Sequence, residues 1–584
     1  MLGLRLICGL SVALAMSAAP ADTRLADAAQ RGERQAVRAL LQQKADVNAA
    51  QGDGMTALHW AAAGNDAELA LLLIRAGANV KATTRVGAMT PLALAASNGN
   101  AAIIDALLNA GADANAATAD GATALMTAAA AGSAEGVKAL LAHGAGANAR
   151  ESAHGQTALM FAAAKNGAEA IRVLLAAGAD AKAATNVVKL ERPRVDEDGN
   201  PLPEATEGPG GRGGRGGRGG GFGGRAGGQG GQARGAAATI TGGMTPLLLA
   251  AREGNADAVR ALLDGGADIN QVSGGEKISP LVIAISNGHY ELARLLLDRG
   301  ADPNLATIDG LAALYATEDT EWAEVGWAPN PITVQEKVSY LDLLKALLQH
   351  GANVNARLTK TLWFRPTSHN EEWVDKKGAT TFWRAAQSSD VAAMRILVAG
   401  GADPNLSTDE GVTPLMVAAG LGWGANATRN APDSWLPTVK YCVELGADVN
   451  AKDIYNYTAL HGAAYRGDND VVKFLVDKGA RLDVRSKRGQ TVTDMANGPM
   501  VNAHLPVEHP DTIALLEKLG APASEVPVAG APRQGRGAGP AAAATAAPVP
   551  AAPARATAAP ARATAAPGTA APATAAPANA APER

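Results

Sequence analysis

The amino-acid sequence predicts an all-α solenoid of about twelve helix-turn-helix units with β-hairpin connections, plus a disordered insert and a disordered tail. The main observation is a tripeptide of Thr, then a small residue or Pro, then Leu, whose neighbouring copies are 33 or 34 residues apart. A second phrase, GADVN or a close variant, recurs between these copies. The chain is also poor in rings, at 3% aromatic residues, and rich in small ones, with 67 Gly. These features are typical of repeated small packing units.

The first element, residues 1–21, has the features of a secretory signal peptide. Arg5 supplies a positive start, residues 6–16 are apolar, and Ala19-Pro20-Ala21 fits a cleavage site. We therefore expect a mature chain that begins at Asp22 and is periplasmic or secreted in a bacterium. The alternative is a buried N-terminal helix.

Charge and cysteine content limit the function further. The net charge is −4 and the pI is about 6.2, which gives no whole-chain attraction to nucleic acid or to an anionic membrane. No stretch after the leader approaches the roughly 20 apolar residues of a membrane span. Without the leader only Cys442 remains, on the apolar stripe of an expected helix, and we expect it to pack in the core.

The segment TALHGAAYRGDNDVVKFLVDKGARLDV, from residue 458, shows how one unit is built. Thr458 can cap the first helix, and Leu460 begins an apolar stripe at helical spacing. Gly467 ends that helix, and a second apolar stripe ends at Gly479. An extended stretch and a turn then lead to the next unit.

These units resemble the ankyrin repeat family, whose pattern is T-P-L-H-x-A with a period of 33. TALHWAA at 56–62 and TALHGAA at 458–464 match nearly completely, whereas TPLALAA, TPLLLAA and TPLMVAA keep TPL and lack the His. The resemblance covers an N-terminal block, 22–184, and a C-terminal block, 243–524. It implies a turn and two antiparallel helices per unit. It also implies that His59 and His461 bond backbone between units.

The two end units depart from the pattern. The first lacks the full tripeptide, because Arg24 stands where a small residue or Pro is usual, and it looks like an N-terminal cap. The last, from Thr491 to Ala521, contains three prolines and looks like a frayed C-terminal cap.

Two segments are not repeats. Residues 185–242 contain GPGGRGGRGGRGGGFGGRAGG, which cannot bury a core and is expected to be disordered. Its Arg-Gly-Gly runs with Phe222 resemble RNA-binding tails, but a flexible loop is the preferred interpretation. Residues 525–584 are Ala/Pro-rich, and we expect a disordered, extended spacer.

Rings are concentrated in three inserted stretches of the C-terminal block, 316–337, 357–383 and 421–437. Insertions in repeat proteins map to loops on one face, and Trp is enriched at binding hot spots. The resemblance adds hairpin tips and first-helix ends as places that family members use for partners. The predicted partner-binding residues are Trp322, Trp327, Trp363, Trp373, Trp423, Trp435, Ile454, Tyr455, Tyr457, Tyr465 and Arg466. The alternative is that the inserts pack as a local mini-core.

We therefore expect a non-enzymatic, monomeric scaffold that binds an unknown protein partner through the concave face and the Trp-rich insertions, with no cofactor and no metal. The alternatives are a glycan or small-ligand binding protein or hydrolase built on the insertions, and RNA binding through the Arg-Gly insert. Two acidic groups are expected to be solvated loops rather than cation sites. These are Glu318, Asp319, Glu321 and Glu324, and His369, Glu371, Glu372 and Asp375.

Overall fold

The computed structural model describes residues 22–190, 239–323, 330–362, 374–424, 431, 435–498 and 507–524. Within them, 24 helices pair into twelve units of two helices each, which confirms the predicted all-α repeat solenoid. The predicted leader, the Ala/Pro-rich tail and most of the Gly/Arg-rich insert lie outside the described residues.

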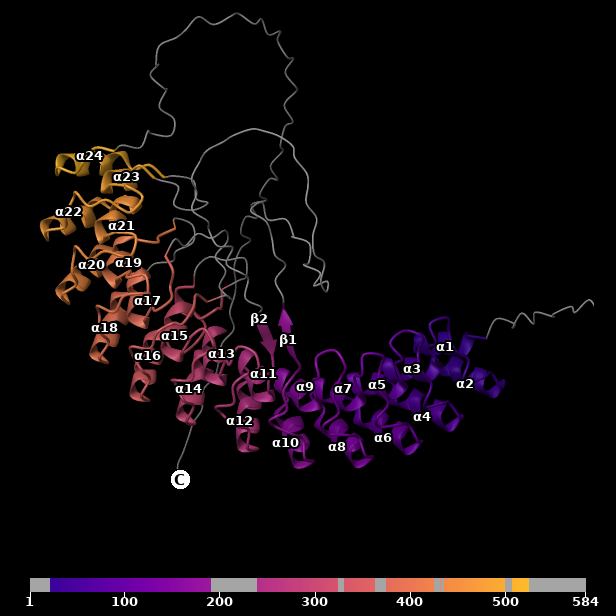
Figure 1. Ribbon diagram of the computed structural model, residues 1–584. Helices are drawn as coiled ribbons and strands as arrows, with labels where there is room; N and C mark the ends of the chain where they lie inside the picture. Colours follow the sequence, from indigo (N-terminus) through magenta and orange to yellow (C-terminus); the bar gives the residue numbers. More distant parts are fainter. Residues whose placement is uncertain are drawn as a thin grey trace, which may run out of the picture. The chain divides into compact units, whose positions relative to one another are not determined.

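Successive units stack through corresponding helices, and Figure 1 shows these helices side by side in two rows. The first helices are α1 (Arg24–Gln30), α3 (Ala57–Ala63), α5 (Pro91–Ser97), α7 (Ala124–Ala130), α9 (Ala158–Ala164), α11 (Pro246–Arg252), α13 (Pro280–Ser286), α15 (Ala313–Glu321), α17 (Thr381–Gln387), α19 (Pro414–Ala419), α21 (Ala459–Arg466) and α23 (Val492–Ala496). The second helices are α2 (Arg34–Gln42), α4 (Ala67–Arg75), α6 (Ala101–Asn109), α8 (Ala134–Ala142), α10 (Ala168–Ala176), α12 (Ala256–Asp264), α14 (Tyr290–Asp298), α16 (Tyr340–Gln349), α18 (Val391–Ala399), α20 (Trp435–Glu444), α22 (Asn469–Asp477) and α24 (Pro510–Lys518).

The recurring Thr-x-Leu tripeptide starts the first helices, as predicted. In most units the Thr side chain accepts a hydrogen bond from the backbone N–H three residues later, as Thr90 does from Ala93 at 3.1 Å. This bond satisfies one of the amides that have no partner within the helix. Where the tripeptide contains Pro, the Pro ring lies in the first turn of the helix. The missing N–H costs nothing there, because N–H groups in the first turn have no acceptor within the helix.

The Asn of the recurring GADVN phrase joins several units to the unit that follows. Asn115 Nδ2 donates to the carbonyl of Gly144 at 2.9 Å, and its Oδ1 accepts from the backbone N–H of Gly146 at 2.8 Å. The side chain of Asn450 makes the same pair of bonds with Gly479 and Arg481. We call this two-bond arrangement the Asn clamp. It explains why the phrase ends in an amide side chain that can both donate and accept.

One apolar core runs through the stack. It is formed largely by Ala, Leu, Val and Ile, and Cys442 is buried in it, as predicted. Small Ala side chains allow the first helices to approach closely. No helix within the described ranges is long and apolar enough to cross a membrane.

The array continues across the insert. Helices α9 and α10 pack directly against α11 and α12, and Asn255 Nδ2 donates to the carbonyl of Ala163 at 3.0 Å. Strands β1 (Val187–Leu190) and β2 (Thr239–Gly242) pair antiparallel, with Val187 opposite Gly242 and Leu190 opposite Thr239. Both ends of the range predicted as insert are therefore ordered strands. The remaining described connections between units are turns, three of which contain a single β-bridge.

Candidate functional site

A carboxylic acid occupies an apolar position of the repeat at Glu318. The residue six positions after the helix N-cap faces the core in every unit. Its counterparts in neighbouring units are Ala62, Ala96, Ala129, Ala163, Ala251, Ile285, Ala386, Ala419 and Ala464, all buried. Glu318 is also 0% exposed. The solvated loop expected for Glu318 and Asp319 was therefore wrong, since both residues lie in α15 and are buried.

The carboxyl group of Glu318 is unusual in its surroundings. Among the described residues, neither of its oxygens has a hydrogen-bond partner. Burial is the main reason that the pKa of Glu318 lies well above the usual range, and the negative charge of Asp390 adds to the effect. Because an isolated buried carboxylate is costly, burial favours the protonated form of Glu318.

Next to Glu318, a buried guanidinium ties α15 to α17. Arg384 Nε donates to Asp319 Oδ1 at 3.0 Å, and Arg384 Nη2 donates to the backbone carbonyl of Trp322 at 2.7 Å. Its Nη1 donates to the hydroxyl of Ser388. This network holds the end of α15, and so fixes where Trp322 lies.

The indole of Trp322 completes the group. Its Nε1 donates to Asp390 Oδ2 at 2.8 Å, and the hydroxyl of Tyr340 donates to the same oxygen at 2.5 Å. The Trp322 and Tyr340 rings meet edge to face, with centroids 6.3 Å apart and planes at 87°. Burial, followed by the bond to Asp390, raises the pKa of Tyr340. We refer to Glu318, Asp319, Trp322, Tyr340, Arg384 and Asp390 as the Trp322 cluster.

A second aromatic group joins the region between α19 and α20 to α21. The rings of Trp423 and Trp435 meet edge to face, with centroids 6.0 Å apart, and the Arg466 guanidinium lies 4.2 Å from the centroid of the Trp435 ring. Both Trp side chains are half-buried. We call Trp423, Trp435 and Arg466 the Trp423 cluster.

Arg466, the third member of this cluster, is held by further contacts. Its side chain is buried, Nη1 donates to the carbonyl of Ala418 at 3.0 Å, and Nη2 lies 3.3 Å from Asp468 Oδ2. Burial lowers the pKa of Arg466 to about 10. Its guanidinium therefore packs against the ring of Trp435 from a buried position.

The hairpin before α21 divides the remaining predicted residues. Ile454 and Tyr455 are exposed, at 44% and 43%. Tyr457 is 4% exposed, packs edge to face on His461, and donates its hydroxyl to Gln490 Oε1 at 2.7 Å. Tyr465 is half-buried, and burial raises its pKa. Ile454 and Tyr455 are thus the hairpin residues that offer surface.

Three predicted residues, Trp327, Trp363 and Trp373, lie outside the described residues. The structure adds Arg384, Asp390 and Tyr340, which the sequence analysis did not select. Glu318 could have been found from the sequence, because it is a charged residue at a position where neighbouring units carry Ala or Ile. The prediction for His59 is confirmed, because its Nε2 lies 3.1 Å from the carbonyl oxygen of Met89 in the next unit.

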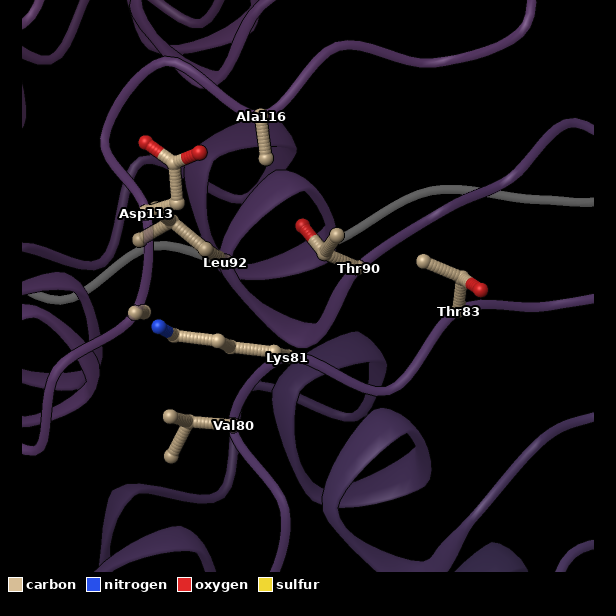
Figure 2. Close-up of a pocket in the computed structure, with 8 residues that line it drawn as sticks. Val80, Lys81, Thr83, Thr90, Leu92, Asp113 and Ala116 are labelled. Carbon is tan, nitrogen blue, oxygen red and sulfur yellow. The ribbon is translucent and has the colours of Figure 1, made fainter.

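A pocket in the N-terminal block offers less chemistry. Figure 2 shows this pocket of about 200 Å³ at a junction of two N-terminal units, lined by residues that include Val80, Lys81, Leu92 and Asp113. The carboxylate of Asp113 accepts a hydrogen bond from the backbone N–H of Asn115, so it stabilises the turn in which it lies. No group of His, Cys, Asp and Glu with a metal-binding arrangement occurs in the part of the chain that the structure describes.

Comparison with known protein families agrees with the fold. A model of ankyrin repeats (3 copies) matches residues 25–118, 92–185 and 231–307, and a model of ankyrin repeats (many copies) matches 429–476. The chain is therefore an ankyrin-repeat solenoid. Ankyrin repeats are generally protein–protein interaction modules, and neither matching family is catalytic.

Individual relatives match over parts of their length. Ankyrin repeat and SAM domain-containing protein 6 of Rattus norvegicus is 38% identical over 92 residues, which are 16% of this chain and 9% of the rat protein. Ankyrin repeat and SOCS box protein 16 of Homo sapiens is 39% identical over 167 residues, 28% of this chain and 30% of the human protein. Ankyrin repeat domain-containing protein 37 of Bos taurus is 29% identical over 108 residues, 18% of this chain and 61% of the bovine protein. The aligned part thus spans less than two thirds of each relative.

Proposed function

We propose that this protein is a non-enzymatic scaffold that binds a protein partner through the C-terminal block. The observation that carries the proposal is the exposure of large apolar side chains there. Ile308, Ile332, Val334, Ile454 and Tyr455 are all exposed. Solvent-exposed apolar side chains and aromatic residues are typical of interaction surfaces.

The Trp423 cluster supports the same surface. Its two indoles are held by packing on each other and on Arg466, so little rotamer entropy would be lost when a partner covers them. Ile454 and Tyr455 lie at the opposite end of α21 from Arg466. A partner that touches both ends of α21 would contact the row of first helices. We take this row to be the concave face predicted from the sequence.

The test uses substitutions at exposed positions, because these leave the core intact. Mature protein carrying Ile454→Lys and Tyr455→Ser is compared with wild type in capturing proteins from an envelope extract of the source organism. The captured partner is then purified and its affinity measured. We expect at least a tenfold loss of affinity, since hot-spot residues each contribute about 2 kcal/mol or more.

The matched control is Val86→Lys, which places the same charge on an exposed apolar residue of the N-terminal block, 81% exposed. It should leave the affinity unchanged. Equal weakening by Val86→Lys would mean that the partner uses the N-terminal block, and unchanged affinity in the Ile454/Tyr455 variant would contradict the proposed surface.

The compartment is also part of this proposal. The pattern of residues 1–21 supports export to the periplasm or beyond. Mass spectrometry of the protein recovered from its native host should show an N-terminus at Asp22. An intact Met1 would contradict export through a cleaved leader.

A further inference from the structure

The surroundings of Glu318 carry more negative than positive charge. The ionisable groups that act on it are the carboxylates of Asp319, Glu321 and Asp390 and, as the single cation within the described residues, the guanidinium of Arg384. With every group ionised, these residues and Glu318 would carry four negative charges and one positive charge. Such an imbalance inside a protein favours either protonation or the entry of a cation.

The neighbouring groups direct their hydrogen bonds elsewhere. Arg384 donates to Asp319, Ser388 and the Trp322 carbonyl. Asp390 accepts from Trp322 and Tyr340 through one oxygen, and from the N–H of Ala393 at the start of α18 through the other. Both oxygens of Glu318 are left without a donor among the described residues. A buried acceptor in this state matches a ligand that brings N–H donors.

Aromatic rings surround the neighbouring carboxylates, because Trp322 and Tyr340 both donate to Asp390. Trp322 and Tyr340 stand at 87° to each other, and the hydroxyl of Tyr290 lies 3.4 Å from Glu321 Oε2. Rings beside carboxylates suit organic cations, because the ring face attracts positive charge and the side chain of such a cation is partly apolar. Glu321, Trp322 and Tyr340 are half-buried, so the cluster reaches the surface of the described part of the chain.

We propose that the Trp322 cluster, with Glu321, binds an organic cation that carries N–H donors, a primary ammonium or a guanidinium, through Glu318 and Asp390. The source is either a free amine or a Lys or Arg side chain of a partner. A quaternary ammonium is excluded by this chemistry, because it has no N–H to give to Glu318. The partner form of the inference rests on the proposed function, whereas the free-amine form does not.

Binding is coupled to a proton. The empty site favours the protonated form of Glu318, because both of its oxygens are buried without a donor among the described residues and burial holds its pKa well above the usual range. A cation beside it favours the carboxylate, so the proton leaves Glu318 for solvent as the cation binds. A purely structural Glu318 would release no proton when an amine is added.

The experiment is calorimetry on mature, full-length protein alone, carried out in phosphate and again in a second buffer that has no N–H donors and a different ionisation enthalpy. The probes are n-butylammonium chloride, the capped peptide acetyl-Gly-Lys-Gly-amide, and tetramethylammonium chloride as the probe without N–H donors. We expect saturable binding of n-butylammonium, no binding of tetramethylammonium, and a heat that changes with the ionisation enthalpy of the buffer. Binding of the peptide as well indicates a partner side chain, and binding of n-butylammonium alone indicates a free amine.

Glu318→Gln keeps the shape of the side chain and removes its charge, and it should weaken binding at least tenfold and abolish proton release. Glu135→Gln, an exposed glutamate of α8, is the matched control and should change neither. Circular dichroism confirms that both variants fold. Equal affinity for tetramethylammonium, or unchanged binding in Glu318→Gln, overturns the inference, as does the failure of both amines to bind. Since no protein partner is present, such a failure leaves the proposed interaction surface of Ile454 and Tyr455 standing.

Discussion

At the scale of single residues, Glu318 shows how one substitution in a repeat can turn packing into chemistry. The units around it place a methyl group or a short aliphatic chain in the same position. There the carboxyl group loses its hydration and gains no hydrogen bond among the described residues. Its presence therefore lowers stability, and the size of the loss depends on pH.

We predict that Glu318→Gln raises stability, and more so at pH 8 than at pH 5. The folded-state pKa of Glu318 is raised above 4.5, its ordinary value. The stability of the wild type is thus complete below about pH 4.5, and part of it is lost as pH rises through the raised pKa. The difference should reach about 1–3 kcal/mol.

Urea unfolding in phosphate buffer, followed by Trp fluorescence at both pH values, measures this effect. Glu135→Gln should shift neither curve, because that side chain is exposed. A Glu318→Gln gain of equal size at pH 5 and pH 8 would show that Glu318 does not titrate with a raised pKa.

Local rules at residue level were enough to predict the capping Thr residues, the His59 contact and the burial of Cys442. Such rules could not predict that Tyr457 and Arg466 are buried, because their burial depends on the neighbouring units. Gln490 and Trp435 cover these two side chains, and both come from units that are adjacent in space.

At the scale of elements, α21 and the turn after α19 approach each other closely in the C-terminal block. Gly462 lies inside α21, and a Cβ there would be 2.4 Å from the backbone N of Leu421 and 3.0 Å from the carbonyl carbon of Gly420. Backbone atoms cannot move aside as a flexible side chain can. The turn that precedes Trp423 is therefore positioned by the absence of a side chain on α21.

We predict that Gly462→Ala lowers the stability of the C-terminal block by about 1–3 kcal/mol, although Ala is the better helix former. It should also change the near-ultraviolet circular dichroism of the Trp423–Trp435 pair. Gly52→Ala is a suitable control, because no atom lies within 4 Å of a Cβ at that position. A stabilised Gly462→Ala protein would mean that the two segments are not in contact.

Helix number and type could be predicted from periodicity alone, since each unit repeats the same two apolar stripes. The elements at the insert could not. Strand β1, with the sequence VVKL, and strand β2, with TITG, were included in the insert because both lie in the long gap between the repeats that start at Thr157 and Thr245. Two strands of four residues give little signal until they pair.

At the scale of the whole array, the insert interrupts the sequence but not the stack. Leu190 is paired with Thr239, so a tight turn can close the ribbon in its place. We predict that replacing residues 191–238 by Asn-Gly leaves the molar circular-dichroism signal of the helices unchanged. The melting temperature should not fall. Shortening the loop should even stabilise the array slightly.

Differential scanning calorimetry of the shortened protein tests this. The control replaces the same residues by a Gly/Ser linker of equal length, which should melt like the wild type. A fall in melting temperature of more than a few degrees in the Asn-Gly protein would show that residues 191–238 contribute to the fold.

The Asn clamp gives the array a direction. Asn115 reaches forward to Gly144, and Asn450 reaches forward to Gly479, so each amide finds its partners in sequence that is translated later. A nascent unit that has just left the ribosome still lacks its clamp. During synthesis, a unit would then gain its clamp only after the following unit has been translated. The unit that emerged last would therefore always be the least stable.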